Sequence, residues 1–185
     1  MLMEKIYSVI RYLTYPAVFV RKMLEFLLCT ALRIDPPADL EEIPYDEIKG
    51  HTPHGEFLFP AKAIVFNLSV FLFQLAGAVG FLAGAIISLY FLDVGLINPT
   101  TGSFDPVFLL YILFMYLGIC FAANLFPSAD SVENFWALCI AEAGTFSRII
   151  FVIPGTILRV GVLLENLGIT AVLAVILPII LKIVL

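Results

Sequence analysis

Two histidines and a glutamate lie close together in the sequence, and residues of these types can bind a metal ion. They are His51, His54 and Glu56. A catalytic zinc usually has three such protein ligands and one open position. The same stretch is also explained as a polar turn built around Pro53 and Gly55. A zinc site is therefore one hypothesis for this segment, and an ordinary surface turn is the other.

Other residues that could carry chemistry form no recognisable catalytic arrangement. The chain has no Gly-x-Ser-x-Gly motif, and no Ser–His or Cys–His pair is suggested by spacing. Asp130 and Glu133 could form an acid pair, although a capped helix start explains the same two residues. Ionisable residues near apolar segments are candidates for a proton relay or ion path, or simply for salt bridges. These residues are Glu142, Arg148, Arg159 and Glu165.

The three cysteines are expected to be packing residues. Cys29, Cys120 and Cys139 all lie in apolar stretches, and no Cys-x-x-Cys spacing occurs. An odd number of widely spaced cysteines predicts neither a disulfide framework nor a zinc knuckle. We interpret them as small core residues.

The first apolar segment, residues 6–33, carries three charges in its middle: Arg21, Lys22 and Glu25. Each charge costs about 2.5–3.5 kcal/mol at the centre of a lone membrane helix, while a large aliphatic residue gains only about 0.3–0.6 kcal/mol. The segment therefore lies in the membrane interface, or spans with its polar face turned into a helix bundle. Arg21 and Glu25 are four residues apart, so they share a helical face and can neutralise each other.

Composition identifies the class of protein that must position these residues. Of the 185 residues, 62% are hydrophobic and 14% are charged, and the mean hydropathy is +1.06. A soluble domain is usually about 45–50% apolar and about 25% charged. A soluble enzyme and a disordered tail are excluded on this ground. Ten basic against fifteen acidic residues also exclude a nucleic-acid binder.

The pattern along the chain predicts an all-α, polytopic membrane helix bundle forming one domain over residues 1–185, with four or five membrane segments. Residues 34–60 are expected to form an acidic loop outside the membrane, broken by prolines. After the first segment, the apolar stretches end in two short ones that are expected to form a bent or re-entrant hairpin. These later stretches are 63–92, 107–126, 149–164 and 167–185.

Small residues within 63–92 predict close packing against another helix. Gly77, Gly80 and Gly84 recur at the intervals typical of helix contacts in membranes. The distribution of Lys and Arg places 34–62 and 127–148 on the cytoplasmic side and 93–105 outside, with the chain ending inside near Lys182.

The order of these parts resembles the site-2-protease-like membrane metalloproteases, in particular their small prokaryotic relatives. The resemblance covers roughly residues 13–182. It is carried by the Tyr15-Pro16 entry, a Gly-His-Thr-Pro turn at 50–53, the long glycine-bearing segment and the turn Phe126-Pro127-Ser128-Ala129-Asp130. Members of that family bind zinc through a His-Glu-x-x-His motif in the first helix, whose glutamate activates water.

The resemblance implies a scaffold that has lost this active site. Arg21 stands at the first histidine, Lys22 at the catalytic glutamate and Glu25 at the second histidine, while Asn124 stands at a later histidine. Asp130 is the nearest match to the family's carboxylate ligand. We expect Arg21 and Glu25 to pair with each other, or with Asn124 or Asp130.

The leading hypothesis is a non-catalytic scaffold or accessory subunit in a larger complex of a prokaryotic cytoplasmic membrane. Its partners would be lipids and other membrane subunits, without nucleic acid and without a cofactor. The first alternative is an intramembrane zinc protease that uses His51, His54 and Asp130. The second is a small transporter or channel that depends on Arg159 or Glu142.

Overall fold

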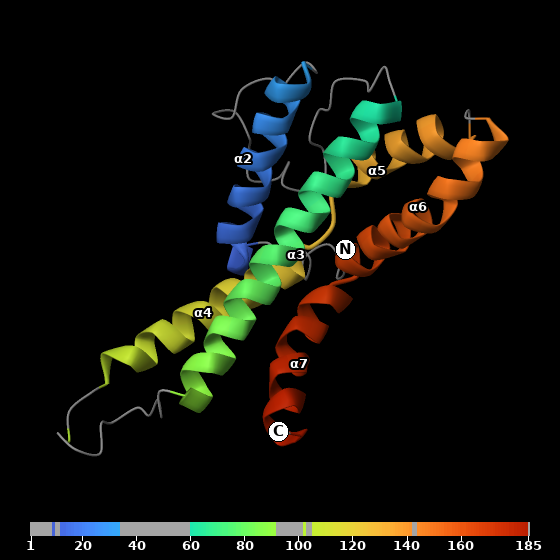
Figure 1. Cartoon of the computed structure of the whole chain (residues 1–185). Coiled ribbons are helices and arrows are strands. Elements are labelled where there is room, and N and C mark those ends of the chain that lie inside the picture. Colours follow the sequence, from blue (N-terminus) through green and yellow to red (C-terminus); the bar gives the residue numbers. More distant parts are fainter. Residues whose placement is uncertain are drawn as a thin grey trace.

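All secondary structure in the part of the chain described by the computed structural model is helical. The described residues are 12–33, 60–91, 105–141 and 144–184, together with 9 and 102. They form six α-helices and one short π-helix, drawn in chain order in Figure 1. The helices are α2 (Tyr15–Leu32), α3 (Pro60–Phe91), α4 (Pro106–Ala123), α5 (Ala129–Trp136), the π-helix η3 (Ala137–Ala141), α6 (Thr145–Asn166) and α7 (Ile169–Val184).

Three of these helices are long and apolar enough to cross a membrane: α3, α4 and α6. This confirms the helical class and agrees with a multi-pass membrane protein. Helix α2 has 18 residues but carries the three charges noted above, and α7 has 16 residues. Apart from Pro60, which begins α3, the expected acidic loop at 34–60 lies outside the described residues.

Helix α3 is the axis of the fold, and two shorter helices lie along its two halves (Figure 1). α2 runs antiparallel to the first half, since Lys62 Nζ donates to Arg33 O near one end of α2 and Gln74 Nε2 donates to Ala17 O near the other. α4 runs antiparallel to the second half. The start of α2 therefore meets the end of α4 near the middle of α3.

The contact between α3 and α4 is built on glycines. A Cβ placed at Gly77 would collide with the ring of Phe121, and one at Gly84 would lie 3.1 Å from the ring of Phe114. Gly80 does not take part in this contact, because a Cβ there would meet no atom within 4 Å. Of the three glycines expected to pack, two face α4 and one faces away.

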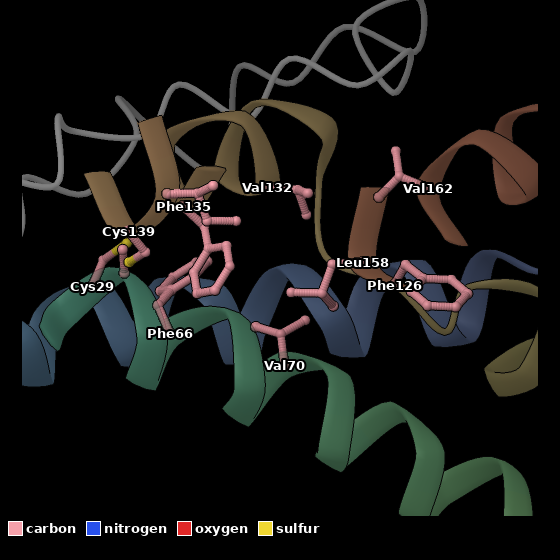
Figure 2. Close-up of a cluster of buried hydrophobic side chains, with 11 residues drawn as sticks. Cys29, Phe66, Val70, Phe126, Val132, Phe135, Cys139, Leu158 and Val162 are labelled. Atoms are coloured by element: carbon pink, nitrogen blue, oxygen red, sulfur yellow. The ribbon is translucent and has the colours of Figure 1, made fainter. Parts of the chain in front are cut away.

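On the other side of α3, helices α5, η3 and α6 enclose the larger hydrophobic core (Figure 2). Phe66 and Val70 of α3 meet Val132 and Phe135 of α5 and Leu158 of α6 there. Cys29 and Cys139 belong to this core and Cys120 to a smaller one, and all three are buried free thiols. Their positions agree with a packing role.

Helices α6 and α7 do not fold back on each other as the expected hairpin would. The chain turns at Gly168, whose φ of +74° is a left-handed conformation that glycine adopts without strain. α7 then continues alongside α4 toward the end of α3 opposite Pro60 (Figure 1). The end near Lys182 therefore lies away from Lys62, although the distribution of Lys and Arg in the sequence predicted both on one side.

Candidate functional site: a buried polar centre

A buried ion pair joins α2 and α6 at the middle of the molecule. Arg21 Nη1 of α2 lies 2.9 Å from Glu165 Oε1 of α6, and the two side chains are only 3% and 6% exposed. The same Nη1 donates to the carbonyl oxygen of Phe126 at 2.8 Å. The second carboxylate oxygen, Glu165 Oε2, accepts from the backbone N–H of Phe126 at 3.0 Å. We call Arg21, Glu165 and the Phe126 backbone the polar centre.

The polar centre fixes the turn between the end of α4 and the start of α5. Residues 124–128 are not helical, and the N–H and C=O of Phe126 in their middle lie outside the hydrogen-bond ladders of α4 and α5. Arg21 supplies a donor to the carbonyl oxygen of Phe126, and Glu165 supplies an acceptor to its N–H. The ring of Phe126 packs against Gly161 of α6 and stacks on Phe71 of α3, with ring centroids 5.5 Å apart. The turn is thus fixed through its backbone and its side chain.

Side chains in the same region also form hydrogen bonds at the neighbouring helix ends. Asn124 Nδ2 donates to Thr14 Oγ1 at the start of α2 (2.8 Å) and to Cys120 O in the last turn of α4 (2.9 Å). Thr170 Oγ1 of α7 donates to Ala123 O at 3.3 Å. Last-turn carbonyls have no partner within their own helix, so these side chains cap α4.

The residues expected to form this centre are only partly brought together. Arg21 and Glu25 are both buried on one face of α2, each 3% exposed, and Asn124 lies at the neighbouring helix end. Asp130 is exposed in the first turn of α5, whose N-cap residue is Ser128. Glu165 forms an ion pair with Arg21, and the sequence had singled it out only as one of several charges near apolar segments.

Two buried amides join α3 to its neighbours. Asn67 Nδ2 donates to Ser131 O at 3.3 Å, and Ser131 Oγ donates back to Asn67 Oδ1 at 3.0 Å, which links α3 to α5. Gln74, also completely buried, links α3 to α2 through Ala17 O. Sequence reasoning missed both. The available signal was their position in a 30-residue stretch without charge, where a polar side chain seldom faces lipid.

A second ion pair lies on the surface between α5 and α6. Arg159 Nε and Nη2 donate to the two oxygens of Glu133 at 2.9 and 2.6 Å, and the side chains are 43% and 57% exposed. The Arg159 guanidinium also lies 4.5 Å above the ring of Trp136. Nearby, Arg148 donates to Ile140 O and Ala141 O at the end of η3. Arg148 and Arg159 therefore fasten α6 to the α5–η3 segment.

The proposed metal ligands His51, His54 and Glu56 lie outside the described residues, and so does Glu142. Within the described ranges, no group of three or more His, Cys, Asp or Glu side chains is placed to hold a metal ion. The position that the metalloprotease resemblance gives to the first zinc-binding histidine holds Arg21, whose cationic guanidinium can donate hydrogen bonds but cannot coordinate a metal.

The polar centre can hold backbone and charge in place, and this is the chemistry its geometry supports. Comparison with protein families, with curated proteins and with solved structures found no match for the chain.

Proposed function

We propose that this protein is a multi-pass integral membrane protein of a prokaryotic cytoplasmic membrane, with α2, α3, α4, α6 and α7 embedded and α5 completing the crossing that α4 begins. Helix α2 supports this through its outward face. Tyr15, Phe19, Met23 and Leu27 are exposed and apolar, while Arg21 and Glu25 point inward. An interfacial helix would expose its charges instead, so α2 is a membrane segment with its polar face turned into the bundle.

The exposed apolar residues of α3 define the thickness of the embedded region. Among the side chains of α3 whose burial is described, residues 60–88, the large exposed apolar ones run from Val65 to Ile87. Twenty-two helical steps are about 33 Å long, close to the roughly 30 Å hydrocarbon core. Gln74 lies near the middle of this stretch. It donates to Ala17 O of α2, which is one helical turn before Arg21. The polar centre is therefore near the middle of the bilayer.

At that depth, the polar centre has a clear physical purpose. Backbone outside a helix is tolerated in hydrocarbon only where protein buries it and completes its hydrogen bonds. Two crossings are broken at this level, between α4 and α5 and between α6 and α7. With α3, they make three crossings. The charged pair completes the backbone of the first break, and Thr170 joins the two breaks through Ala123 O.

This arrangement supports a non-catalytic scaffold or accessory subunit of a larger membrane complex. The observation that carries the proposal is the engagement of Arg21 with Glu165 and Phe126. Arg21 is the residue that stands at the first zinc position in the metalloprotease resemblance. A side chain committed to holding a helix break serves structure rather than peptide hydrolysis.

Purification of the full chain in mild detergent tests this proposal. We expect a complex with other membrane subunits in a fixed ratio that persists through size-exclusion chromatography, without zinc at one ion per chain. Zinc near that ratio, together with cleavage of membrane substrates that is lost in His51→Ala, would establish the protease alternative. A chain that runs alone and shows neither property would also reject the scaffold proposal.

One observation favours a transporter as a second candidate. Transporters often bind substrates near the bilayer midplane, between helices that are broken there. The breaks at 124–128 and 167–168 fit that description. Ion or solute flux in proteoliposomes that is lost in Glu165→Gln but kept in the surface variant Glu133→Gln would support this candidate.

A further inference from the structure

The single tryptophan of the chain lies at one edge of the apolar stretch of α3. Two contacts fix the position of Trp136 along α3. Ser131, at the start of α5, forms hydrogen bonds with Asn67 of α3, and the Sγ atom of Cys139, in η3, lies 3.7 Å from Pro60 O. Trp136 comes between Ser131 and Cys139 in the sequence. It therefore lies beside the segment of α3 that contains Lys62, just before the exposed apolar residues begin at Val65.

The residues around Trp136 have the chemistry of a membrane–water boundary. Trp136 is partly exposed, and the half-exposed Arg159 guanidinium covers its ring and pairs with the exposed Glu133. Tryptophan is enriched at this boundary because one part of its ring is apolar and its N–H is polar. An exposed ion pair is strongly disfavoured in hydrocarbon, but is readily accommodated among hydrated headgroups.

Helix α6 adds an exposed apolar strip beside this cluster. Phe146, Ile149, Ile153 and Ile157 recur at helical spacing, and each is more than half exposed. Arg148, Thr156 and Arg159 lie on a neighbouring exposed strip of the same helix, which also carries Val152. A helix with adjacent apolar and polar outer strips fits acyl chains on one side and headgroups on the other.

We propose that Trp136, Arg159 and Glu133 form an interfacial anchor that contacts phospholipid headgroups, while the apolar strip of α6 enters the acyl chains beside it. The occupant is the phospholipid surface rather than another protein, because exposed large apolar residues also lie on α3, α4 and α7, among them Val172 and Ile176 of α7. This inference rests on the proposed membrane location, and it adds the depth and the contacts of α5 and α6.

Fluorescence of the full chain in vesicles tests the anchor, because Trp136 is the only tryptophan. The probes are phosphatidylcholines brominated near the headgroup or near the chain end. We expect shallow bromines to quench Trp136 at least twofold more than deep ones. A matched variant, Trp136→Phe with Phe73→Trp, moves the tryptophan to an exposed site near the middle of α3 and should show the reverse order.

The two chains separate failure of the anchor from failure of the membrane proposal. If Phe73→Trp responds to deep bromines while Trp136 responds most to deep bromines or to none, the anchor is rejected and the membrane location stands. If neither tryptophan is quenched by any brominated lipid, the membrane proposal fails and the anchor fails with it.

Discussion

At the scale of single residues, two Arg–Glu pairs in this protein differ mainly in burial. Arg21–Glu165 is almost completely buried, and Arg159–Glu133 is about half exposed. Both have short N–O distances, so distance alone does not distinguish their importance. Removing one partner of a buried pair leaves an uncompensated charge, whereas an exposed pair is hydrated whether or not it forms.

We therefore expect Glu165→Leu to destabilise the protein by about 3–5 kcal/mol and its matched control Glu133→Leu by about 1 kcal/mol or less. Glu165→Leu removes a buried carboxylate that accepts from Arg21 and from Phe126 N–H. Denaturant titration in mixed micelles measures the free energy of unfolding of the two variants. Equal effects of the two substitutions would show that the buried pair has no special role.

The buried thiol of Cys139 gives a second prediction at this scale. Burial raises the pKa of this thiol, so less of the reactive thiolate is present at neutral pH. We expect Cys139, in a chain with the other two cysteines changed to Ala, to resist maleimide in native membranes and to react after denaturation in SDS. Its native rate should rise with pH. Rapid labelling at neutral pH would mean that the core around η3 opens readily.

At the scale of helices, the packing of α3 on α4 depends on which glycines face the partner. Gly77 and Gly84 are seven residues apart and meet Phe121 and Phe114, which are also seven apart on the antiparallel helix. Gly80, between them, points elsewhere. The three glycines look equivalent in the sequence. They differ in the direction in which an added Cβ would point, toward α4 at Gly77 and Gly84 and away from it at Gly80.

Gly77→Ala should destabilise the chain by about 1–3 kcal/mol, because its methyl group would overlap the Phe121 ring. Gly80→Ala should be neutral or stabilising by up to about 1 kcal/mol, since alanine is the better helix former and its methyl group meets no atom. Thermal unfolding in one detergent compares the two. A lower melting temperature for Gly80→Ala than for Gly77→Ala would contradict the packing of α3 on α4.

At the scale of the whole molecule, the helix breaks decide the topology. Arg33, Lys62 and Arg148 lie toward one end of α3, and this concentration of basic residues favours the cytoplasmic side. If α6 and α7 make one broken crossing, the end of the chain lies on the opposite side. If α6 and α7 formed a hairpin, the end of the chain would return to the cytoplasmic side.

We expect Ala141→Cys, in a background without the native thiols, to be labelled from the cytoplasmic side. Gly102→Cys and a cysteine added after Leu185 should be labelled only from the outside. Ala141 and Gly102 are both exposed, so access to a probe depends on sidedness. Labelling of the C-terminal cysteine from the same side as Ala141→Cys would contradict the broken crossing and support a hairpin of α6 and α7.

The sequence by itself determined the helical class and indicated a membrane protein, because an apolar fraction of 62% leaves too little polar surface for a soluble fold. It also indicated that Arg21 and Glu25 share a face, since helical periodicity is a local property. The tertiary structure alone decided that Arg21 meets Glu165, 144 residues later, at the Phe126 turn. Periodicity tells which residues share a face, but a contact between distant helices depends on where each helix stops and turns. Those stops, at Asn124 and Gly168, bring the polar centre together.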